Sequence, residues 1–395
     1  MRLPSVFRGL PRTFWVLWLG NLIDRIGGFG YAFLSLYLTG QKHLAIDETA
    51  AILSLGGLGG FAGALVGGVL ADHLGRKTTL VASMATSGVV MAALGLVRDP
   101  WPIAALWLIY GFASAAARPA SSALVADTVP AADRLRAFGL LHWAVNIGFA
   151  IAPAIGGFLA RRTFTGLFLA DGATTLLCAA LIAVQVPKTP LPPQTEPIWR
   201  GLTRVFRDPP YLTFLAFVFA SGLIYAQAEC ALPIDLVAHG LAPETYGLVI
   251  AANGVLITLL SPVASAWLRS SEPTRVLAAA MALTGVGFGL NALVSTAPLY
   301  AVAVVIWTLG EIASSPASGA LVASLAPLEQ RGRYSGAYAM AVSLTRFAGP
   351  TLGGLVLGHA GSGTLWLGCL GVGLAAAAGF TVLAPALRRR MAELR

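Results

Sequence analysis

Six ionisable residues lie well inside the long apolar stretches of this sequence. These residues are Asp24, Arg25, Arg118, Glu229, Glu311 and Arg346. A carboxyl group removed from water resists ionisation unless a cation lies beside it, so it can take up and release a proton. The pattern predicts proton-transfer chemistry, with Asp24 and Glu311 as first candidates for the carrier. Glu229 is expected to act as a carrier or to bind a cationic substrate.

Static ion pairing that helps helices to fold is the alternative for these residues, and for Arg25 and Arg346 it is at least as strong. Arg118 is interpreted either as a charge without an assigned role or as the partner of Asp24. Asp171 and Asp235 lie nearer the ends of their apolar stretches, and an interfacial position is favoured for both.

The elements that must position these residues are membrane-spanning helices. Hydrophobic residues make up 57% of the chain and charged residues 11%, which is too little polar surface for a soluble protein of 395 residues. The apolar runs are continuous rather than alternating, and each is long enough to cross a bilayer as a helix. The predicted class is an all-α integral membrane protein with twelve transmembrane helices, at about 14–38, 46–71, 78–97, 102–127, 137–160, 165–186, 211–238, 245–268, 276–295, 299–325, 334–359 and 363–385.

Basic residues indicate how the chain lies in the membrane. The net charge is +9, yet the Lys and Arg residues gather at alternate loops rather than in a stripe suited to nucleic acid. The loops opposite the N-terminus contain only four of the basic residues, which are Lys42, Arg98, Arg161 and Arg162. The positive-inside rule therefore places both termini in the cytoplasm, in the inner membrane of a bacterium.

An internal repeat divides the chain into two halves. Residues 119–157 align with 316–354 without gaps at an offset of 197, and 16 of 39 positions are identical. Each half then holds six spans in the same orientation, which is a parallel repeat. The predicted units are a six-helix bundle at 1–186, a Pro-rich cytoplasmic linker at 187–210 and a second six-helix bundle at 211–395.

A polar loop motif, GVLADHLGRKTTL at 68–80, joins the second and third spans. Gly75 lets the chain reverse, and Asp72 ends a helix where it can meet the positive N-terminal end of another helix. Arg76 requires a carboxylate partner, and Lys77 adds to the positive charge. Topology alone could explain the basic residues of the loop.

With this motif and repeat, the chain resembles the major facilitator superfamily, and within it the twelve-helix drug and proton antiporter group. Gly68, Asp72, Gly75, Arg76 and Lys77 match the signature of that superfamily. The resemblance implies alternating access between two bundles. It also implies that Asp72 locks against the eleventh helix and that Arg76 pairs with Asp127, whereas the corresponding stretch at 264–276 has lost the pattern.

A second motif lies on the fifth span and resembles the antiporter signature GxxxGPxxGG. Gly148, Pro153, Gly156 and Gly157 match it, while Ala152 stands where the signature has Gly. The resemblance implies close packing at the seam between the halves and favours export. A generic small-residue packing face is the alternative.

The first span, NLIDRIGGFG, is faintly similar to the ExxER pattern of proton-coupled peptide transporters, with Asn21 in place of the first acid. This similarity keeps import open as an alternative. The expected substrate cavity is partly aromatic and is lined by Asn21, Phe29, Tyr31, Tyr37, Asn146, Tyr225, Gln227, Trp307 and Tyr338.

The sequence thus predicts a proton-coupled exporter of amphipathic or cationic small molecules. Alternatives are a proton symporter that imports a sugar, peptide or organic anion, and a lipid-handling or sensor protein on the same fold. No phosphate-binding loop or metal-ligand spacing occurs, so an enzyme, a metal site and a cofactor are not expected. The expected partners are a small-molecule substrate, protons and the lipid bilayer, and the predicted state is a monomer.

Overall fold

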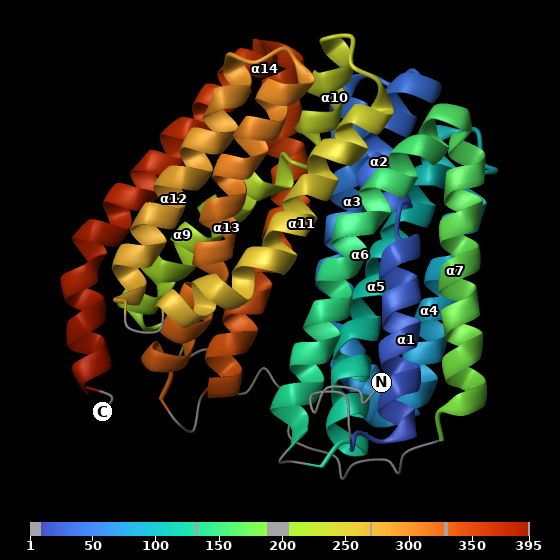
Figure 1. Cartoon of the computed structure of the whole chain (residues 1–395), viewed down its shortest axis with the longest axis horizontal. Coiled ribbons are helices and arrows are strands. Elements are labelled where there is room, and N and C mark those ends of the chain that lie inside the picture. Colours follow the sequence, from blue (N-terminus) through green and yellow to red (C-terminus); the bar gives the residue numbers. More distant parts are fainter. Residues whose placement is uncertain (1–8, 131–132, 188–204, 269–270, 328–330, 394–395) are drawn as a thin grey trace, which may run out of the picture.

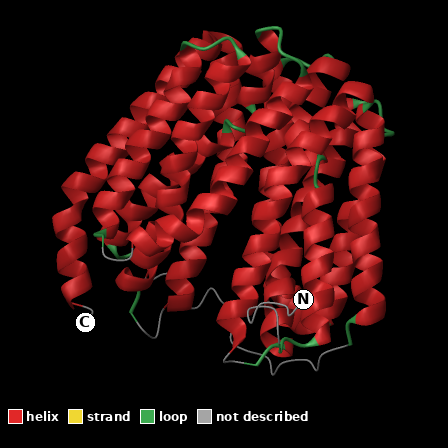
Figure 2. Cartoon of the chain, viewed as in Figure 1, coloured by secondary structure: helices red, strands yellow, loops and turns green. Residues whose placement is uncertain are grey.

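The computed structural model describes residues 9–130, 133–187, 205–268, 271–327 and 331–393. Most of the predicted linker at 187–210 therefore lies outside the described residues. The described chain is helical nearly throughout, as Figure 2 shows. Backbone polar groups in lipid must be satisfied within each segment, and helices meet that requirement.

The helices follow the predicted spans, with most ends shifted by a few residues. They are α1 (Arg12–Gly27), α2 (Gly30–Leu36), α3 (Ile46–Leu74), α4 (Arg76–Leu94), α5 (Pro100–Thr128), α6 (Arg134–Arg162), α7 (Phe164–Gln185), α9 (Pro209–Ala226), α10 (Ala231–Ala238), α11 (Pro243–Leu268), α12 (Pro273–Gly289), α13 (Ala297–Leu325) and α14 (Arg331–Glu393), with a π-helix at Tyr37–Gln41 and a 3-10 helix at Leu290–Ala292.

Ten stretches of the described residues are long and apolar enough to cross a membrane. One of them, within α14, is two spans, because Gly361 leaves the helical conformation at φ 83° and ψ 168°. The first span is not among the ten because it is broken into α1, α2 and the π-helix. Together these make the twelve predicted spans.

The first and seventh spans are broken near corresponding places. The first breaks at Gly28 and Phe29, and the seventh breaks between α9 and α10 at residues 227–230. An offset of 197 brings these breaks within a few residues of each other. Each break leaves backbone groups that need partners from outside the helix.

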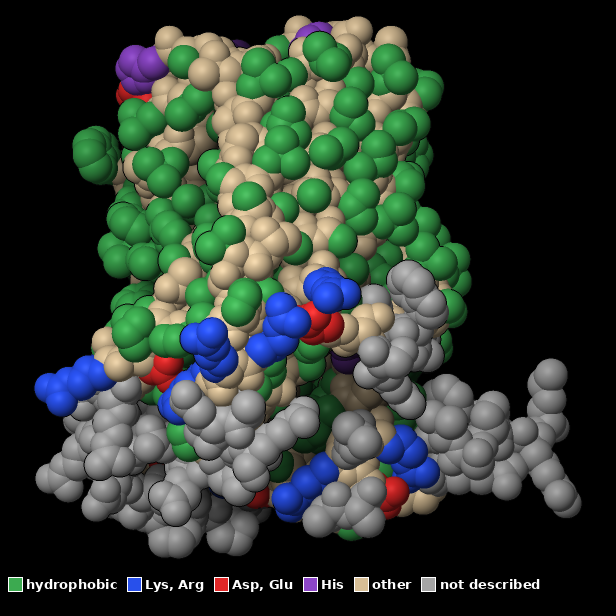
Figure 3. All heavy atoms as spheres, turned by 90° about the vertical axis from the view of Figure 1, so that its left-hand side faces the viewer, with side chains coloured by type: hydrophobic (Ala, Val, Ile, Leu, Met, Phe, Trp, Pro, Cys, Tyr) green, Lys and Arg blue, Asp and Glu red, His purple; other side chains and the backbone are tan. Residues whose placement is uncertain are grey.

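Two bundles lie side by side, α1 to α7 in one and α9 to α14 in the other (Figure 1). The first and last described residues lie at the same end of the molecule, here called the terminal end, and the opposite end is called the distal end. On the face drawn in Figure 3, Lys and Arg side chains gather toward the terminal end, while hydrophobic side chains and other uncharged groups cover most of the rest and histidine lies at the distal end. This arrangement agrees with the predicted distribution of basic loops.

The bundles meet along two helix pairs, α3 with α14 and α6 with α11. At these contacts backbone approaches backbone. A Cβ at Gly57 of α3 would overlap the carbonyl group of Arg346, and one at Gly254 of α11 would lie 2.5 Å from Phe149 and Ala150 of α6. We call these contacts the distal seam, because they run from the middle of the four helices to their distal ends, where Gly354 meets Ala50 and Gly157 meets Glu244.

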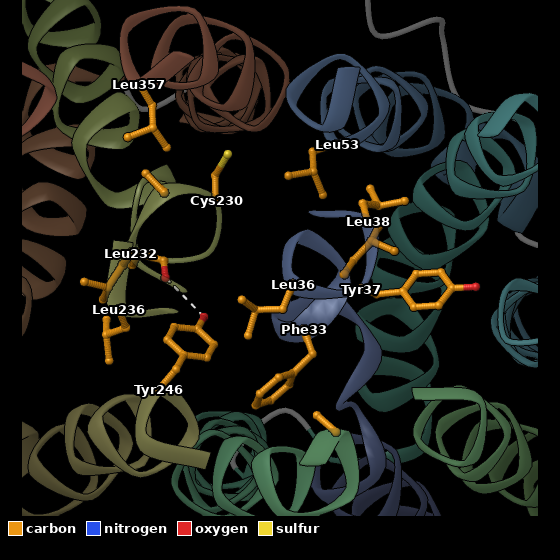
Figure 4. Close-up of a cluster of buried hydrophobic side chains, with 14 of the residues drawn as sticks. Phe33, Leu36, Tyr37, Leu38, Leu53, Cys230, Leu232, Leu236, Tyr246 and Leu357 are labelled. Carbon is orange, nitrogen blue, oxygen red and sulfur yellow. Dashed lines mark hydrogen bonds between the residues drawn. The ribbon is translucent and has the colours of Figure 1, made fainter. Parts of the chain in front are cut away.

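Three hydrophobic clusters explain the shape. One lies at the distal end and draws side chains from both bundles, including Phe33 and Leu36 of α2, Leu232 of α10 and Tyr246 of α11 (Figure 4). The Tyr246 hydroxyl donates a hydrogen bond of 3.1 Å to the Ala228 carbonyl. The other two clusters lie toward the terminal end, and each belongs to one bundle alone.

Near the terminal end the facing helices leave room between them. A methyl group added at Gly68, Gly139 or Gly336 would meet nothing within 4 Å. The structure is therefore closed at the distal end and open toward the terminal end.

A methyl group at the distal seam should disturb the contact between the bundles. We expect Gly57→Ala to lower the free energy of unfolding in detergent by about 1–3 kcal/mol, the usual cost of overpacking. The matched control is Gly68→Ala, eleven residues further along α3, which should leave stability unchanged or raise it by up to about 1 kcal/mol through helix propensity. Equal effects of the two substitutions on thermal unfolding would contradict this account of the seam.

Candidate functional site

A group of charged and aromatic side chains lies at mid-height between the bundles. Tyr31 of α2 lies close to Glu229, which lies in the break of the seventh span. The guanidinium of Arg346, from α14, lies 5.7 Å from the centre of the Tyr31 ring. Arg346 and Arg118 both act electrostatically on Glu229. The structure thus brings three of the predicted residues into one site that both bundles share.

The break in the seventh span also joins the two bundles through its backbone. Ser35 of α2 donates a hydrogen bond of 3.3 Å to the carbonyl oxygen of Glu229. A carbonyl freed by a helix break is thereby satisfied from the opposite bundle. Glu229 is consequently held to the first bundle through its backbone.

Asp24 is paired within its own helix. Its carboxylate lies 2.9 Å from the guanidinium of Arg25 and accepts a hydrogen bond of 3.1 Å from Thr175 of α7. The expectation that Arg118 pairs with Asp24 is therefore not met, because the adjacent Arg25 fills that role. Arg25 and Arg118 still interact as like charges.

Asp171 has a structural task that the sequence analysis did not assign. Its carboxylate accepts a hydrogen bond of 2.7 Å from the backbone N–H of Gly30, the first residue of α2. The side chain is buried, with 2% of its surface exposed. Asp171, for which an interfacial position was favoured, thus lies against the break of the first span and satisfies an exposed helix N-terminus.

Glu311 of α13 lies in a second polar group, inside the second bundle. Asn253 of α11 donates hydrogen bonds of 2.9 Å to Glu311 and 3.0 Å to Thr308. No cation lies within ion-pair distance of Glu311 among the described residues. Glu229 is close enough to act on Glu311 electrostatically, so the two acids are coupled.

Several residues expected to line the cavity are packed instead. Phe29, Tyr37, Gln227 and Trp307 expose between 1% and 5% of their surface. The Tyr37 hydroxyl bonds to the carbonyls of Leu94 and Val97, and Gln227 donates to the carbonyl of Gly349. The Tyr37 hydroxyl and the Gln227 amide nitrogen reach backbone carbonyls, which explains why these two polar side chains are tolerated in the core, whereas Trp307 Nε1 has no partner among the described residues.

The remaining cavity candidates are half-buried. Asn21 and Asn146 lie on α1 and α6, and Tyr225 of α9 shares a hydrogen bond of 2.9 Å with Thr284. Tyr338 borders a cavity of about 230 Å³ between α13 and α14, together with Gly319 and Val322.

The loop motif at 68–80 is only partly engaged. Gly75 has a φ of 92°, a conformation that suits glycine at the turn between α3 and α4. Arg76 forms an ion pair with Asp127 at the end of α5, and Lys77 donates to the carbonyl of Ala183. Asp72 is exposed, and no described residue of α14 pairs with it. The expected lock against the eleventh span therefore has no counterpart among the residues of that span that the structure describes.

The motif on α6 serves two contacts. Gly148 lies against Arg25 of α1, and Gly156 lies against the rings of Phe29 and Phe33. Pro153 and Gly157 face the other bundle, where they meet Gly247 and Glu244 of α11. Half of the motif therefore lies at the distal seam and half packs the first span.

Other members of the site were missed by the sequence analysis. Tyr110 stacks on Trp107 at a ring distance of 4.9 Å, and Trp107 lies 5.5 Å from Tyr31. Asn253 holds Glu311, and Arg161 pairs with Glu244 at 2.9 Å across the distal seam. Of these residues, only Asn253 could have been found from the sequence, because it is a single polar residue in an apolar helix.

Comparisons with known proteins agree with one another on the family. The model of the Major Facilitator Superfamily matches residues 17–234 and 219–394. A relative in Bacillus subtilis, the uncharacterized MFS-type transporter YttB, is 26% identical over 91% of this chain and 92% of its own length. The multidrug resistance protein MdtH of Escherichia coli is 28% identical over 78% of this chain and 74% of its own length.

Solved structures share the fold at low sequence identity. The nucleoside transporter NupG has a TM-score of 0.83 at 14% identity and covers 94% of this chain and 100% of its own. A POT family transporter in complex with a thioalcohol-conjugated peptide has a TM-score of 0.84 at 16% identity, with 96% and 98% covered.

The hydrogen bond between Asp171 and Gly30 gives a testable consequence for stability. Asp171→Ala leaves a buried N–H without an acceptor and should lower the free energy of unfolding by about 1–3 kcal/mol. Asp171→Asn retains an acceptor oxygen and should lose less. Thermal unfolding in detergent checks both, with the exposed Asp47→Asn as the control. Equal stability of Asp171→Ala and the wild type would show that Asp171 does not hold the break.

Proposed function

The chain belongs to the major facilitator superfamily, and from that membership we propose that it is a proton-coupled exporter of small amphipathic molecules. In this proposal the two bundles alternate between a terminal-open and a distal-open arrangement around the site at mid-height. The terminal end faces the cytoplasm of a bacterium, in keeping with the basic loops there.

The observation that carries the proposal is the setting of Glu311. This acid is half-buried inside the membrane span, is held by the amide of Asn253 and has no cation within ion-pair distance among the described residues. An ionised carboxylate in such a place costs several kcal/mol, so a bound proton is the natural way to neutralise it. Asp24 differs, because Arg25 already neutralises it. Glu311 is therefore the better candidate for the carrier.

Two further observations favour export. The similarity to the multidrug resistance protein MdtH points to drug-like cargo moving outward. The motif on α6 places Pro153 and Gly157 at the contact with α11, where an antiporter motif would seal the bundles against each other.

A second candidate function is proton-coupled import of a metabolite. It is favoured by the Asp24–Arg25 pair on the broken first span, and the folds of the peptide and nucleoside transporters are compatible with it. In both candidates the protein is a multi-pass membrane transporter that binds small molecules.

Removal of the proposed proton carrier should separate coupling from transport. We expect Glu311→Gln to abolish accumulation driven by a pH gradient while substrate exchange between the two sides continues. The reason is that the amide can still accept the hydrogen bond from Asn253 but cannot carry a proton. Proteoliposomes with an imposed pH gradient and a panel of amphipathic cations, anions and neutral compounds provide the measurement.

Asp47→Asn, at an exposed acid of the distal end, is the matched control and should behave as the wild type. Asp24→Asn should retain part of the coupling, because its carboxylate is permanently paired. Full gradient-driven accumulation by Glu311→Gln would overturn the assignment of the carrier. Co-directional movement of proton and substrate would favour import instead.

A further inference from the structure

Two arginines lie near each other at mid-height, one from each bundle. Arg118 lies on α5 and Arg346 on the first half of α14, and both side chains are exposed. The strongest charge acting on Arg118 is the like charge of Arg346. Within the described residues, neither guanidinium has a carboxylate at ion-pair distance.

The acids of the membrane interior are held by other partners. Asp24 is paired with Arg25, Asp171 accepts the N–H of Gly30, and Glu311 accepts from Asn253. Glu229 acts electrostatically on both Arg118 and Arg346, but within the described residues it forms an ion pair with neither. One acid therefore balances two arginines, and positive charge is left over at this point.

Excess charge in a membrane span is unfavourable unless a ligand or water compensates it. A guanidinium is a planar fork of N–H donors that matches the oxygens of a carboxylate or a phosphate. Two such forks on opposite walls can hold one oxyanion between them. No cationic ligand would relieve the repulsion between them.

Aromatic surface lies beside the two arginines. The ring of Tyr31 is 5.7 Å from the Arg346 guanidinium, and the rings of Tyr31, Trp107 and Tyr110 follow one another at 5.5 and 4.9 Å. Tyr31 and Tyr110 are half-buried, so each keeps exposed surface. A ligand with an acidic group at one end and an aromatic or apolar body at the other would use both features.

Resting on the proposed transport function, we propose that the substrate carries a carboxylate, phosphate or similar oxyanion, which binds between Arg118 and Arg346 with its apolar body against Tyr31 and Tyr110. Amphipathic anions and zwitterions are then the substrate class, in place of simple cations. Because the two arginines belong to different bundles, the bound anion bridges them and draws the bundles together at mid-height. Loading of the site thereby favours closure of the terminal end.

Equilibrium binding to the purified protein tests this assignment without a proton gradient. The ligands are 2-naphthoate, 2-naphthyl phosphate, 2-naphthalenemethanol and (2-naphthylmethyl)ammonium, which share one aromatic body and differ in charge. We expect the two anions to bind about tenfold or more tightly than the alcohol and the ammonium compound, the size typical of charge-assisted hydrogen bonds. A single-chain lysophosphatidate determines whether a lipid headgroup can supply the same chemistry.

Variants of the two arginines complete the test. Arg118→Gln and Arg346→Gln should each weaken binding of 2-naphthoate about tenfold or more and leave binding of the alcohol unchanged, while Arg118→Lys should lie between. The control is Arg98→Gln, an exposed arginine of the distal loop between α4 and α5, which should change nothing. Without ligand, Arg118→Gln should unfold at a higher temperature than the wild type, because a repulsion between like charges is removed.

Tighter binding of the ammonium compound, or no preference for the anions up to millimolar concentration, would overturn the proposal. An equal loss of affinity for 2-naphthoate and for the alcohol in the arginine variants would also overturn the proposal, because it would indicate that the arginines only shape the site. Stronger binding of lysophosphatidate than of the naphthyl anions would assign the oxyanion to a lipid. A protein that binds the anions but shows no gradient-driven transport would refute the proposed function while the anion site stands.

Discussion

The close approach of backbone to backbone at the distal seam is the contact on which the rest of the structure depends. Helix α3 meets α14 and α6 meets α11 at positions without side chains, so the two bundles touch over a narrow strip. Van der Waals packing of this kind is what holds helices together in lipid, where no hydrophobic force acts between them. The strip determines which end is closed and so gives the charged residues at mid-height access from one side.

Charges within the membrane interior fall into two groups. Asp24, Arg25 and Asp171 are engaged by near neighbours within the first bundle and hold the broken first span in place. Arg118, Arg346 and Glu229 come from both bundles and are compensated only in part. The first group stabilises a conformation, whereas the second depends on what enters the cavity. A charge within the membrane interior is costly, and charged residues there that do not stabilise the fold usually belong to a functional site.

Much of the fold was predictable because hydropathy and repetition act along the chain. Continuous apolar runs gave the twelve spans, and the break at Gly361 falls between the two runs predicted at 334–359 and 363–385. Arg76 and Asp127 pair as the loop motif implied. The site was harder to predict, because it depends on contacts between distant segments. No pattern in the sequence predicts the hydrogen bond between Asp171 and Gly30 or the contact between Arg346 and the ring of Tyr31. Trp307 and Tyr37 were misplaced because an aromatic residue in a span has the same signal whether it lines a cavity or fills a core.

The break in the first span assigns its two parts to different neighbours. Phe14, Val16 and Leu17 of α1 belong to the terminal cluster of their own bundle, whereas Phe33, Leu34 and Leu36 of α2 belong to the distal cluster shared by both bundles. A single uninterrupted helix would couple these clusters rigidly. With Gly28 and Phe29 between them, α1 can follow its bundle while α2 keeps to the distal cluster. In terms of unfolding, the span is the border between two cooperative units, so amide hydrogen exchange should change in protection from α1 to α2 within a single membrane crossing.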